Sequence, residues 1–270
     1  MQKLKLVPWI ACFLLLVSLT ACVSEKAVQK VAEKAVGKAE ADGALKEEKL
    51  ISIEKDKPSK LDAKKDKKNW DKRTFFQFMK PIVERENKLV MQDRQHLLAW
   101  QKNKDFEAGD LKPIAQRYRV QWNGKADGRF WRSILDRVDE IPLELALIQA
   151  ANESSWGNSR FARQANNYFG QWCFRQGCGL VPLRRNAGAT HEVQYFSSAD
   201  LSVRAYLFNL NTSPSYKLFR NLRRALRRQN KPLDAEFLAI GLKGYSERGM
   251  HYVRIIQSMV RSNKQLIQTL

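Results

Sequence analysis

Residues 141–151 read Ile141-Pro142-Leu143-Glu144-Leu145-Ala146-Leu147-Ile148-Gln149-Ala150-Ala151, and this stretch decides the fold of the 270-residue chain. Apolar side chains occupy it nearly all round, whereas a helix at the surface keeps a polar face. Proline suits the first position of a helix, because its backbone dihedral is already helical and its missing N–H has no partner there. The stretch therefore predicts a central helix that the rest of the domain buries.

Helical spacing of apolar residues predicts further helices on both sides of the central one. A serine before such a stripe can cap the helix that follows, because its side-chain oxygen accepts from a free backbone N–H. The predicted helices open at Pro81, cover about 111–118 and 130–138, start after Ser197 or Ser198, carry Tyr216 to Leu226, and run from about Gly249. The chain is thus expected to form one mainly α domain.

The stretch over residues 170–196 has a different composition. Turn-forming residues interrupt it at Gly170, Gly177, Gly179, Pro182 and Gly188. Residues 191–196 include Val, Tyr and Phe, which favour a strand. A small lobe of two or three strands is therefore expected inside the otherwise helical domain.

The first 21 residues are predicted to be a secretory signal. Lys3 and Lys5 precede an apolar run over residues 7–19, which is too short to span a bilayer. Leu19-Thr20-Ala21-Cys22 resembles the bacterial lipobox, which implies cleavage before Cys22 and acylation of its thiol; an ordinary signal with a chance cysteine is the alternative. Valine rather than aspartate follows the cysteine, so we expect a lipoprotein of the outer membrane that faces the periplasm.

Residues 22–72 are predicted to be a disordered spacer that leads to the folded domain over 73–270. Up to residue 70 the spacer holds 13 Lys and 10 acidic residues and almost no aromatic ones, so it cannot form a core. The whole chain carries a net charge of +20, and most of it therefore belongs to the domain. Such a charge is typical of proteins that meet polyanions. Export and the lack of a recognised motif argue against nucleic acid.

The four cysteines separate into two groups. Cys12 is lost with the signal and Cys22 carries lipid, so Cys173 and Cys178 remain in the exported chain. In the oxidising periplasm we expect these two to form a disulfide. A metal site needs two more ligands, and the nearest histidine is His191; no metal is expected.

Glu153 stands at the end of the central helix and is followed by Ser154, Ser155, Trp156 and Gly157. Neighbouring aliphatic side chains, the negative end of the helix dipole and a nearby indole all disfavour a charged carboxylate. A general acid for glycosidic cleavage must hold its proton near neutral pH, so this environment favours that role. A solvated glutamate at a helix end is the alternative. Gly157 is expected to stop the helix.

Residues 150–159 resemble the catalytic-glutamate segment of bacterial cell-wall glucosaminidases, the endo-β-N-acetylglucosaminidase domain of glycoside hydrolase family 73. Further segments similar to that family follow in the same order, at 166–170, 195–206 and 244–252. Within the family, Trp172-Cys173 and His191-Glu192 look most like the Bax-type proteins of Gram-negative bacteria. The resemblance covers about residues 75–265 and implies a lysozyme-like α+β fold, mainly α with a small β-lobe.

The resemblance implies a peptidoglycan hydrolase that acts on glycan strands without a cofactor. Glu153 would protonate the β-1,4 bond between N-acetylglucosamine and N-acetylmuramic acid. Glycosidases usually need a second group, and Glu192 is the candidate by its neighbourhood. The 2-acetamido group of the substrate is the alternative nucleophile. Muramidase or lytic transglycosylase action, or wall binding without catalysis, are the other functions considered.

Aromatic residues are the candidates for holding sugars, because they offer an apolar face and often a polar group. The candidates are Trp156, Tyr168, Trp172, Tyr245 and Tyr252. Tyr252 also fits a core stripe, and Trp172 either stacks on sugar or packs on the disulfide. A basic helix face carries Arg220, Arg223, Arg224, Arg227 and Arg228. It is either solvated or meets the carboxylates of peptide stems or anionic lipid.

Replacing Cys22 with alanine tests the lipid anchor. The variant should leave the membrane fraction or stay unprocessed, because alanine has no thiol to acylate. Membrane fractionation and the mass of the mature N-terminus measure this. A variant that fractionates and matures like the wild type would show that the chain is not a lipoprotein.

Overall fold

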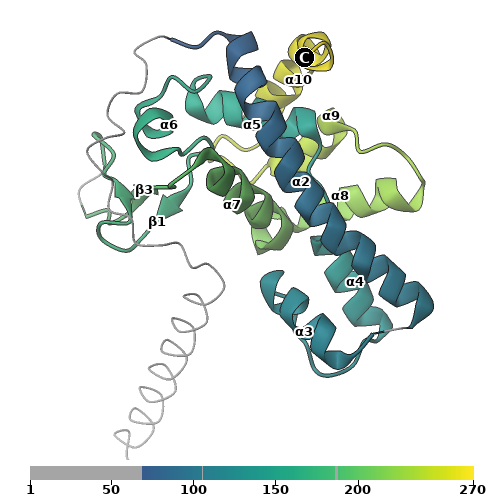
Figure 1. Cartoon of the computed structure of the whole chain (residues 1–270). Helices are drawn as coiled ribbons and strands as arrows, with labels where there is room; N and C mark the ends of the chain where they lie inside the picture. The colour runs from purple at the N-terminus through teal and green to yellow at the C-terminus, as the bar shows by residue number, and fades with distance from the viewer. Residues whose placement is uncertain (1–68, 105, 186–187) are drawn as a thin grey trace, which may run out of the picture. The chain divides into compact units, whose positions relative to one another are not determined.

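A computed structural model describes residues 69–270 of the chain, apart from residue 105 and residues 186–187 (Figure 1). The predicted signal, the lipobox and nearly all of the predicted spacer lie outside these residues, so those expectations stay predictions. The described residues fall within one compact unit. None of the helices in this part of the chain is long and apolar enough to cross a membrane.

The described part is mainly helical. Its elements are α2 (Lys72–Asn103), α3 (Ala108–Arg117), α4 (Gly128–Arg137), α5 (Leu143–Ser154), α6 (Arg160–Ala165), β1 (Trp172–Cys173), β2 (Gly179–Leu180), β3 (Glu192–Gln194), α7 (Ala199–Thr212), η2 (Pro214–Tyr216), α8 (Lys217–Arg228), α9 (Ala235–Leu238), η3 (Ala239–Leu242) and α10 (Met250–Gln268). A small sheet between α6 and α7 interrupts the helices. The expected class, a mainly α, lysozyme-like α+β fold with a small β-lobe, is confirmed.

Helix α5 is the predicted central helix. Leu145, Leu147 and Ile148 have no exposed surface, and full burial of such a side chain stabilises the fold by about 1.5–3 kcal/mol. Helices α2 and α10 both pack against α5 (Figure 1). Pro142 is the residue that precedes the helix rather than its first member. The core therefore forms around α5, as its sequence predicts.

Helix α2 begins earlier than the sequence suggests, and the expectation that Pro81 opens it is wrong. Asp71 caps the helix by accepting from the backbone N–H of Thr74 at 2.7 Å, and Pro81 lies inside it. A proline within a helix costs about 3 kcal/mol, because it removes a hydrogen bond and crowds the preceding turn. Burial of Phe75 and Phe76, which have no exposed surface, offsets that cost and extends the helix across the proline.

A second apolar cluster joins the C-terminal half of α2 to α3 and α4. Leu97 of α2, Leu111 of α3 and Ile134 of α4 are fully buried in it. These helices match the predicted stretches at 111–118 and 130–138. Because α2 contributes to both clusters, it fixes this part of the domain to the core around α5.

The β-lobe is a three-stranded antiparallel sheet in the order β1-β3-β2. Trp172 pairs with Val193 and Cys173 with Glu192 between β1 and β3. The expected disulfide between Cys173 and Cys178 is present. The two sulfur atoms and the Glu192 carboxylate lie within 4.8 Å of one another. A thiol that is part of a disulfide does not bind metal as a thiolate, so the cysteines serve the loop and not a metal site.

Removing the disulfide should destabilise the domain. The variant Cys173→Ser/Cys178→Ser is expected to lose about 2–3 kcal/mol of unfolding free energy, because the open loop gains entropy in the unfolded chain. Urea unfolding measures the loss, and wild type in a reducing agent is the matched control. Equal unfolding free energies for the variant and the oxidised wild type would contradict this prediction. Two free thiols in denatured wild type that was never reduced would also contradict it.

Candidate active site

Glu153 lies in the last turn of α5 and is partly buried. Its Oε1 accepts from the hydroxyl of Tyr252 at 2.9 Å and from Nδ2 of Asn152 at 3.0 Å. Its Oε2 has no hydrogen-bond partner among the described residues. One oxygen is thus held by the protein, while the other remains available to a ligand.

A line of buried hydrogen bonds runs from α7 through α5 and α10 to Glu153. The hydroxyl of Tyr206 donates to Oε1 of Gln149 at 2.7 Å, and Nε2 of Gln149 donates to the hydroxyl of Tyr252 at 3.0 Å. Every donor in the series points towards Glu153, and such chains of hydrogen bonds strengthen one another. Gln149 precedes Glu153 by four residues, so both side chains lie on one face of α5.

The tyrosines at the site remain protonated, as a hydrogen-bond donor must. Burial and the nearby carboxylate of Glu153 raise the pKa of Tyr252, and burial, Tyr252 and Glu153 raise that of Tyr245. The two rings stack with centroids 5.5 Å apart. The hydroxyl of Tyr245 donates to the carbonyl oxygen of Phe169 at 2.9 Å. Both hydroxyls therefore have fixed acceptors, and the stack holds their rings in place.

The turn that follows Glu153 has an unusual backbone. Ser155, Trp156 and Gly157 have φ values of 52°, 58° and 76°, three left-handed residues in succession. Ser155 rather than Gly157 ends the helix, so the expected helix stop is misplaced by two residues. A side chain on Gly157 would put its Cβ 2.8 Å from the ring of Trp70. Non-glycine residues in this region carry strain, which often accompanies functional sites.

Helix α2 packs against this turn. The ring of Trp156 meets Phe75 and Phe76 edge to face, with centroids 6.0 and 5.4 Å apart. The ammonium group of Lys72 lies 5.1 Å from the centroid of the same ring. Trp156 is therefore held by packing and a cation–π contact, and it is only partly exposed to a ligand.

The Asn-Asn-Tyr-Phe-Gly segment at 166–170 ties the β-lobe to the helical core. Nδ2 of Asn167 donates to the carbonyl oxygens of Gln171 and Gln194, both at 2.9 Å. Gly170, with a φ of 67°, faces Glu153, and a Cβ on it would lie 3.8 Å from Oε2. The segment therefore places Gly170, which has no side chain, beside Oε2 of Glu153, the oxygen that has no hydrogen-bond partner among the described residues.

Glu192, the candidate for the second catalytic group, has both carboxylate oxygens bonded within the β-lobe. Its side chain is buried, its Oε1 accepts from the backbone N–H of Gly177 at 2.9 Å, and its Oε2 accepts from that of Gly179 at 2.8 Å. These two bonds lower the pKa of the Glu192 carboxyl. Among the described residues, no hydrogen bond joins Glu192 to Glu153. The hydrogen bonds to Gly177 and Gly179 hold the disulfide loop against β3.

The other predicted sugar-binding residues differ in exposure. Tyr168 is buried near Phe75 and Phe78, and burial raises its pKa to about 12. Trp172 is 56% exposed and stacks on His191 with centroids 4.0 Å apart. Trp172 is thus open to a ligand, whereas Tyr168, like Tyr252, belongs to the core in this structure.

Sequence reasoning missed several residues that shape the site. They are Gln149, Asn152, Tyr206 and Gly170. Gln149 had a visible signal, because it is the polar residue one helical turn before Glu153 in an otherwise apolar run. Tyr206 on α7 had none, because it lies far from Glu153 in the sequence.

Comparison with known proteins identifies the family. The family model described as mannosyl-glycoprotein endo-beta-N-acetylglucosaminidase, or glucosaminidase, matches residues 131–265. The chain belongs to the glucosaminidase family. It is also 36% identical to Protein bax of Escherichia coli (strain K12) over 199 residues, which cover 73% of this chain and 71% of that protein. No solved structure matches significantly.

The match to the glucosaminidase family includes Glu153 and its tyrosine partners but begins within α4. Helices α2 and α3 therefore lie outside the matched region. Since α2 packs on α5 and holds Trp156, residues beyond the matched region complete this glucosaminidase domain.

Replacing Tyr252 with phenylalanine tests the buried line of hydrogen bonds. The change removes the donor to Glu153 and leaves Nε2 of Gln149 without its acceptor, which should cost about 1–3 kcal/mol of unfolding free energy. Tyr195→Phe is the matched control, because the Tyr195 hydroxyl has no hydrogen bond among the described residues. Urea unfolding compares the two variants. An equal loss of unfolding free energy in the two variants would mean that the Tyr252 hydroxyl does not stabilise the site.

Proposed function

We propose that this protein is a peptidoglycan hydrolase that cleaves the β-1,4 bond between N-acetylglucosamine and N-acetylmuramic acid, with Glu153 as the general acid. The observation that carries the proposal is the asymmetric environment of Glu153, whose Oε1 is held by two donors while Oε2 lies open beside Gly170. Membership of the glucosaminidase family supports glycosidase chemistry. The predicted export signal and the resemblance to cell-wall enzymes favour peptidoglycan over other glycans.

The contacts of Glu153 suit the first step of such a cleavage, which is protonation of the glycosidic oxygen. A proton on Oε2 of Glu153 would pass to the glycosidic oxygen while the bond from that oxygen to C1 of N-acetylglucosamine breaks. The resulting carboxylate would keep the hydrogen bonds from Tyr252 and Asn152 at Oε1. Donors that are already in place stabilise the charge as it forms, without the cost of reorienting.

The contacts of Glu192 favour the acetamido group of the substrate as the nucleophile in this cleavage. Acting as a base or nucleophile would require this side chain to give up its bonds to the amides of Gly177 and Gly179. The 2-acetamido oxygen of the substrate would instead attack C1 as the leaving sugar departs. Water would then attack C1 and open the cyclic intermediate, and the proton that it loses would return to the carboxylate of Glu153. This releases N-acetylglucosamine at the new reducing end. We further propose that the mature protein is anchored by lipid to the outer membrane on its periplasmic face.

The variant Glu153→Gln tests the general acid. Glutamine keeps the size of the side chain and its hydrogen bonds but has no proton to transfer, so turnover should fall by about 10²–10⁴-fold. Digestion of purified sacculi followed by mass spectrometry of the fragments measures the loss and identifies the bond. The variant should still bind insoluble peptidoglycan. Glu153→Asp should also be poor, because its shorter side chain misplaces the proton.

Glu192→Gln is the matched control for the second group. A mild loss supports the acetamido route, whereas a loss as large as that of Glu153→Gln supports two catalytic carboxylates. Wild-type turnover by a folded Glu153→Gln variant would contradict the proposed mechanism. Fragments that end in N-acetylmuramic acid, or in its anhydro form, would instead identify a muramidase or a lytic transglycosylase.

A further inference from the structure

A cavity of about 280 Å³ lies between α2, α4 and α8. Asp139, on its wall, precedes the first turn of α5, whereas Glu153 lies in the last turn. A helix of 12 residues separates them by about 18 Å. The cavity is therefore distinct from the site around Glu153, and the proposed function does not use it.

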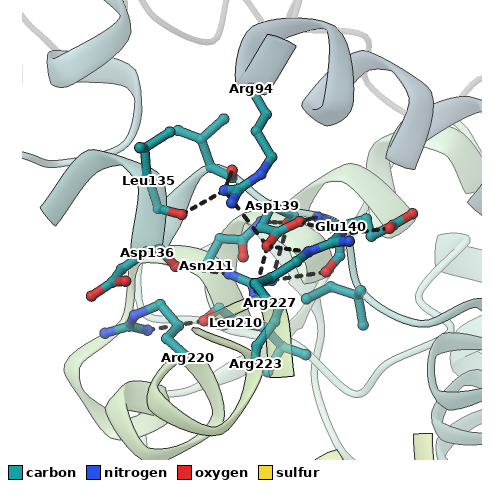
Figure 2. Close-up of polar contacts among 12 residues, drawn as sticks. Arg94, Leu135, Asp136, Asp139, Glu140, Leu210, Asn211, Arg220, Arg223 and Arg227 are labelled. Carbon is teal, nitrogen blue, oxygen red and sulfur yellow. Dashed lines mark hydrogen bonds and ion pairs between the residues drawn. The ribbon is translucent and has the colours of Figure 1, made fainter. Parts of the chain in front are cut away.

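The walls of the cavity are rich in arginine (Figure 2). The arginines are Arg94, Arg132, Arg220, Arg223, Arg224, Arg227 and Arg228. Two carboxylates, Asp136 and Asp139, line the same space. Even with Glu140, which pairs with Arg227, the cations outnumber the anions.

The lining carboxylates already have partners. Oδ1 of Asp139 accepts from Nη2 of Arg227 at 2.8 Å, and its Oδ2 lies 3.5 Å from Nη1 of Arg94 and 3.8 Å from Nε of Arg223. Asp136 pairs with Arg224. Among the described residues, no ion pair joins either carboxylate to Arg132, Arg220 or Arg228.

Two of the arginines are buried and bind helix ends. Nη1 of Arg220 donates to the carbonyl oxygens of Leu210 and Ser213 at 2.9 and 2.8 Å. Arg223 donates to the carbonyl oxygens of Asp136, Asp139 and Glu140. These bonds satisfy carbonyls at the ends of α7 and α4 that have no partner within the helix.

Burial makes these two charges costly. Desolvation, together with the charge of neighbouring arginines, lowers the pKa of both Arg220 and Arg223 to about 10. Among the described residues, Arg220 has no carboxylate within ion-pair distance. A bound anion would offset the repulsion among these cations.

Arg132 and Arg228 also line the cavity, and neither binds a carbonyl oxygen or a carboxylate of the described residues. Neither side chain makes a hydrogen bond or an ion pair with any residue that the structure describes. Arg132 and Arg228 are both exposed. Both guanidinium groups therefore have N–H donors free for a ligand.

We propose that this cavity binds a phosphoryl group. Guanidinium groups bind phosphate through paired N–H donors. Several arginines that converge on one cavity suit an anion with several oxygens better than a single carboxylate. The phosphoryl group comes either from a lipid headgroup or from a soluble phosphate, and the same arginines would bind both.

Thermal unfolding of the purified full chain tests the proposal. Sodium phosphate at about ten times its Kd should raise Tm by about 3–6 °C over sodium chloride of equal ionic strength. The variant Arg132→Gln/Arg228→Gln should bind phosphate at least tenfold more weakly by calorimetry. It should still fold, because these side chains bind no other described residue. Arg254→Gln/Lys264→Gln, which removes two exposed charges from α10, is the matched control and should bind like the wild type.

Two further probes identify the source of the phosphoryl group. Glycerophosphoglycerol carries the phosphodiester of an anionic lipid without its acyl chains. Tighter binding of this probe supports a lipid headgroup, and tighter binding of inorganic phosphate supports a soluble phosphate. Acetate should bind far more weakly than either. Absence of phosphate binding, equal affinity in the Arg132→Gln/Arg228→Gln variant, or equal affinity for acetate would overturn the proposal.

Discussion

The burial of helix α5 is the constraint on which the rest of the structure depends. Its apolar surface requires cover on all sides, and α2 and α10 supply much of it. Gln149 is buried with the apolar residues, so both ends of its amide need partners. Tyr206 and Tyr252 provide them, and the hydroxyl of Tyr252 then donates to Glu153. The orientation of the candidate acid is thus linked to the hydrogen bonds of a core amide one helical turn away.

The two ends of α5 are supported by different chemistry. At its start, the carbonyls of Asp139 and Glu140 accept from Arg223, a buried cation that also binds the end of α4. At its end, a left-handed turn rests on the aromatic rings of α2. Arginine spreads five donors over three nitrogens in a fixed fork, whereas the three donors of lysine share one nitrogen. Arg223 also adds its positive charge to the lining of the cavity.

The sequence pattern predicted those features that depend on residues close together in the chain. The apolar run of α5, the serine cap at 198, the turn-rich stretch of the β-lobe and the close pair of cysteines all carry their reason in neighbouring residues. Pro81 misled because packing of residues before it outweighs its local preference. The bond between Gln149 and Tyr252 joins positions 103 residues apart, which periodicity does not reveal. The contacts of Glu192 depend on how the disulfide loop closes, so its neighbourhood in the sequence did not predict them.

The attachment of Trp70 has a mechanical consequence. Its backbone N–H donates to Oδ1 of Asn158 at 2.9 Å and its carbonyl accepts from Nδ2 of the same residue at 2.9 Å. Asn158 belongs to the turn that begins just after Glu153. Tension on the chain before α2 would therefore act on this pair and on the bond from Arg163 to the side chain of Asn69. A pull that breaks the pair would separate Asn158, in the turn beside the candidate acid, from the residues that precede α2.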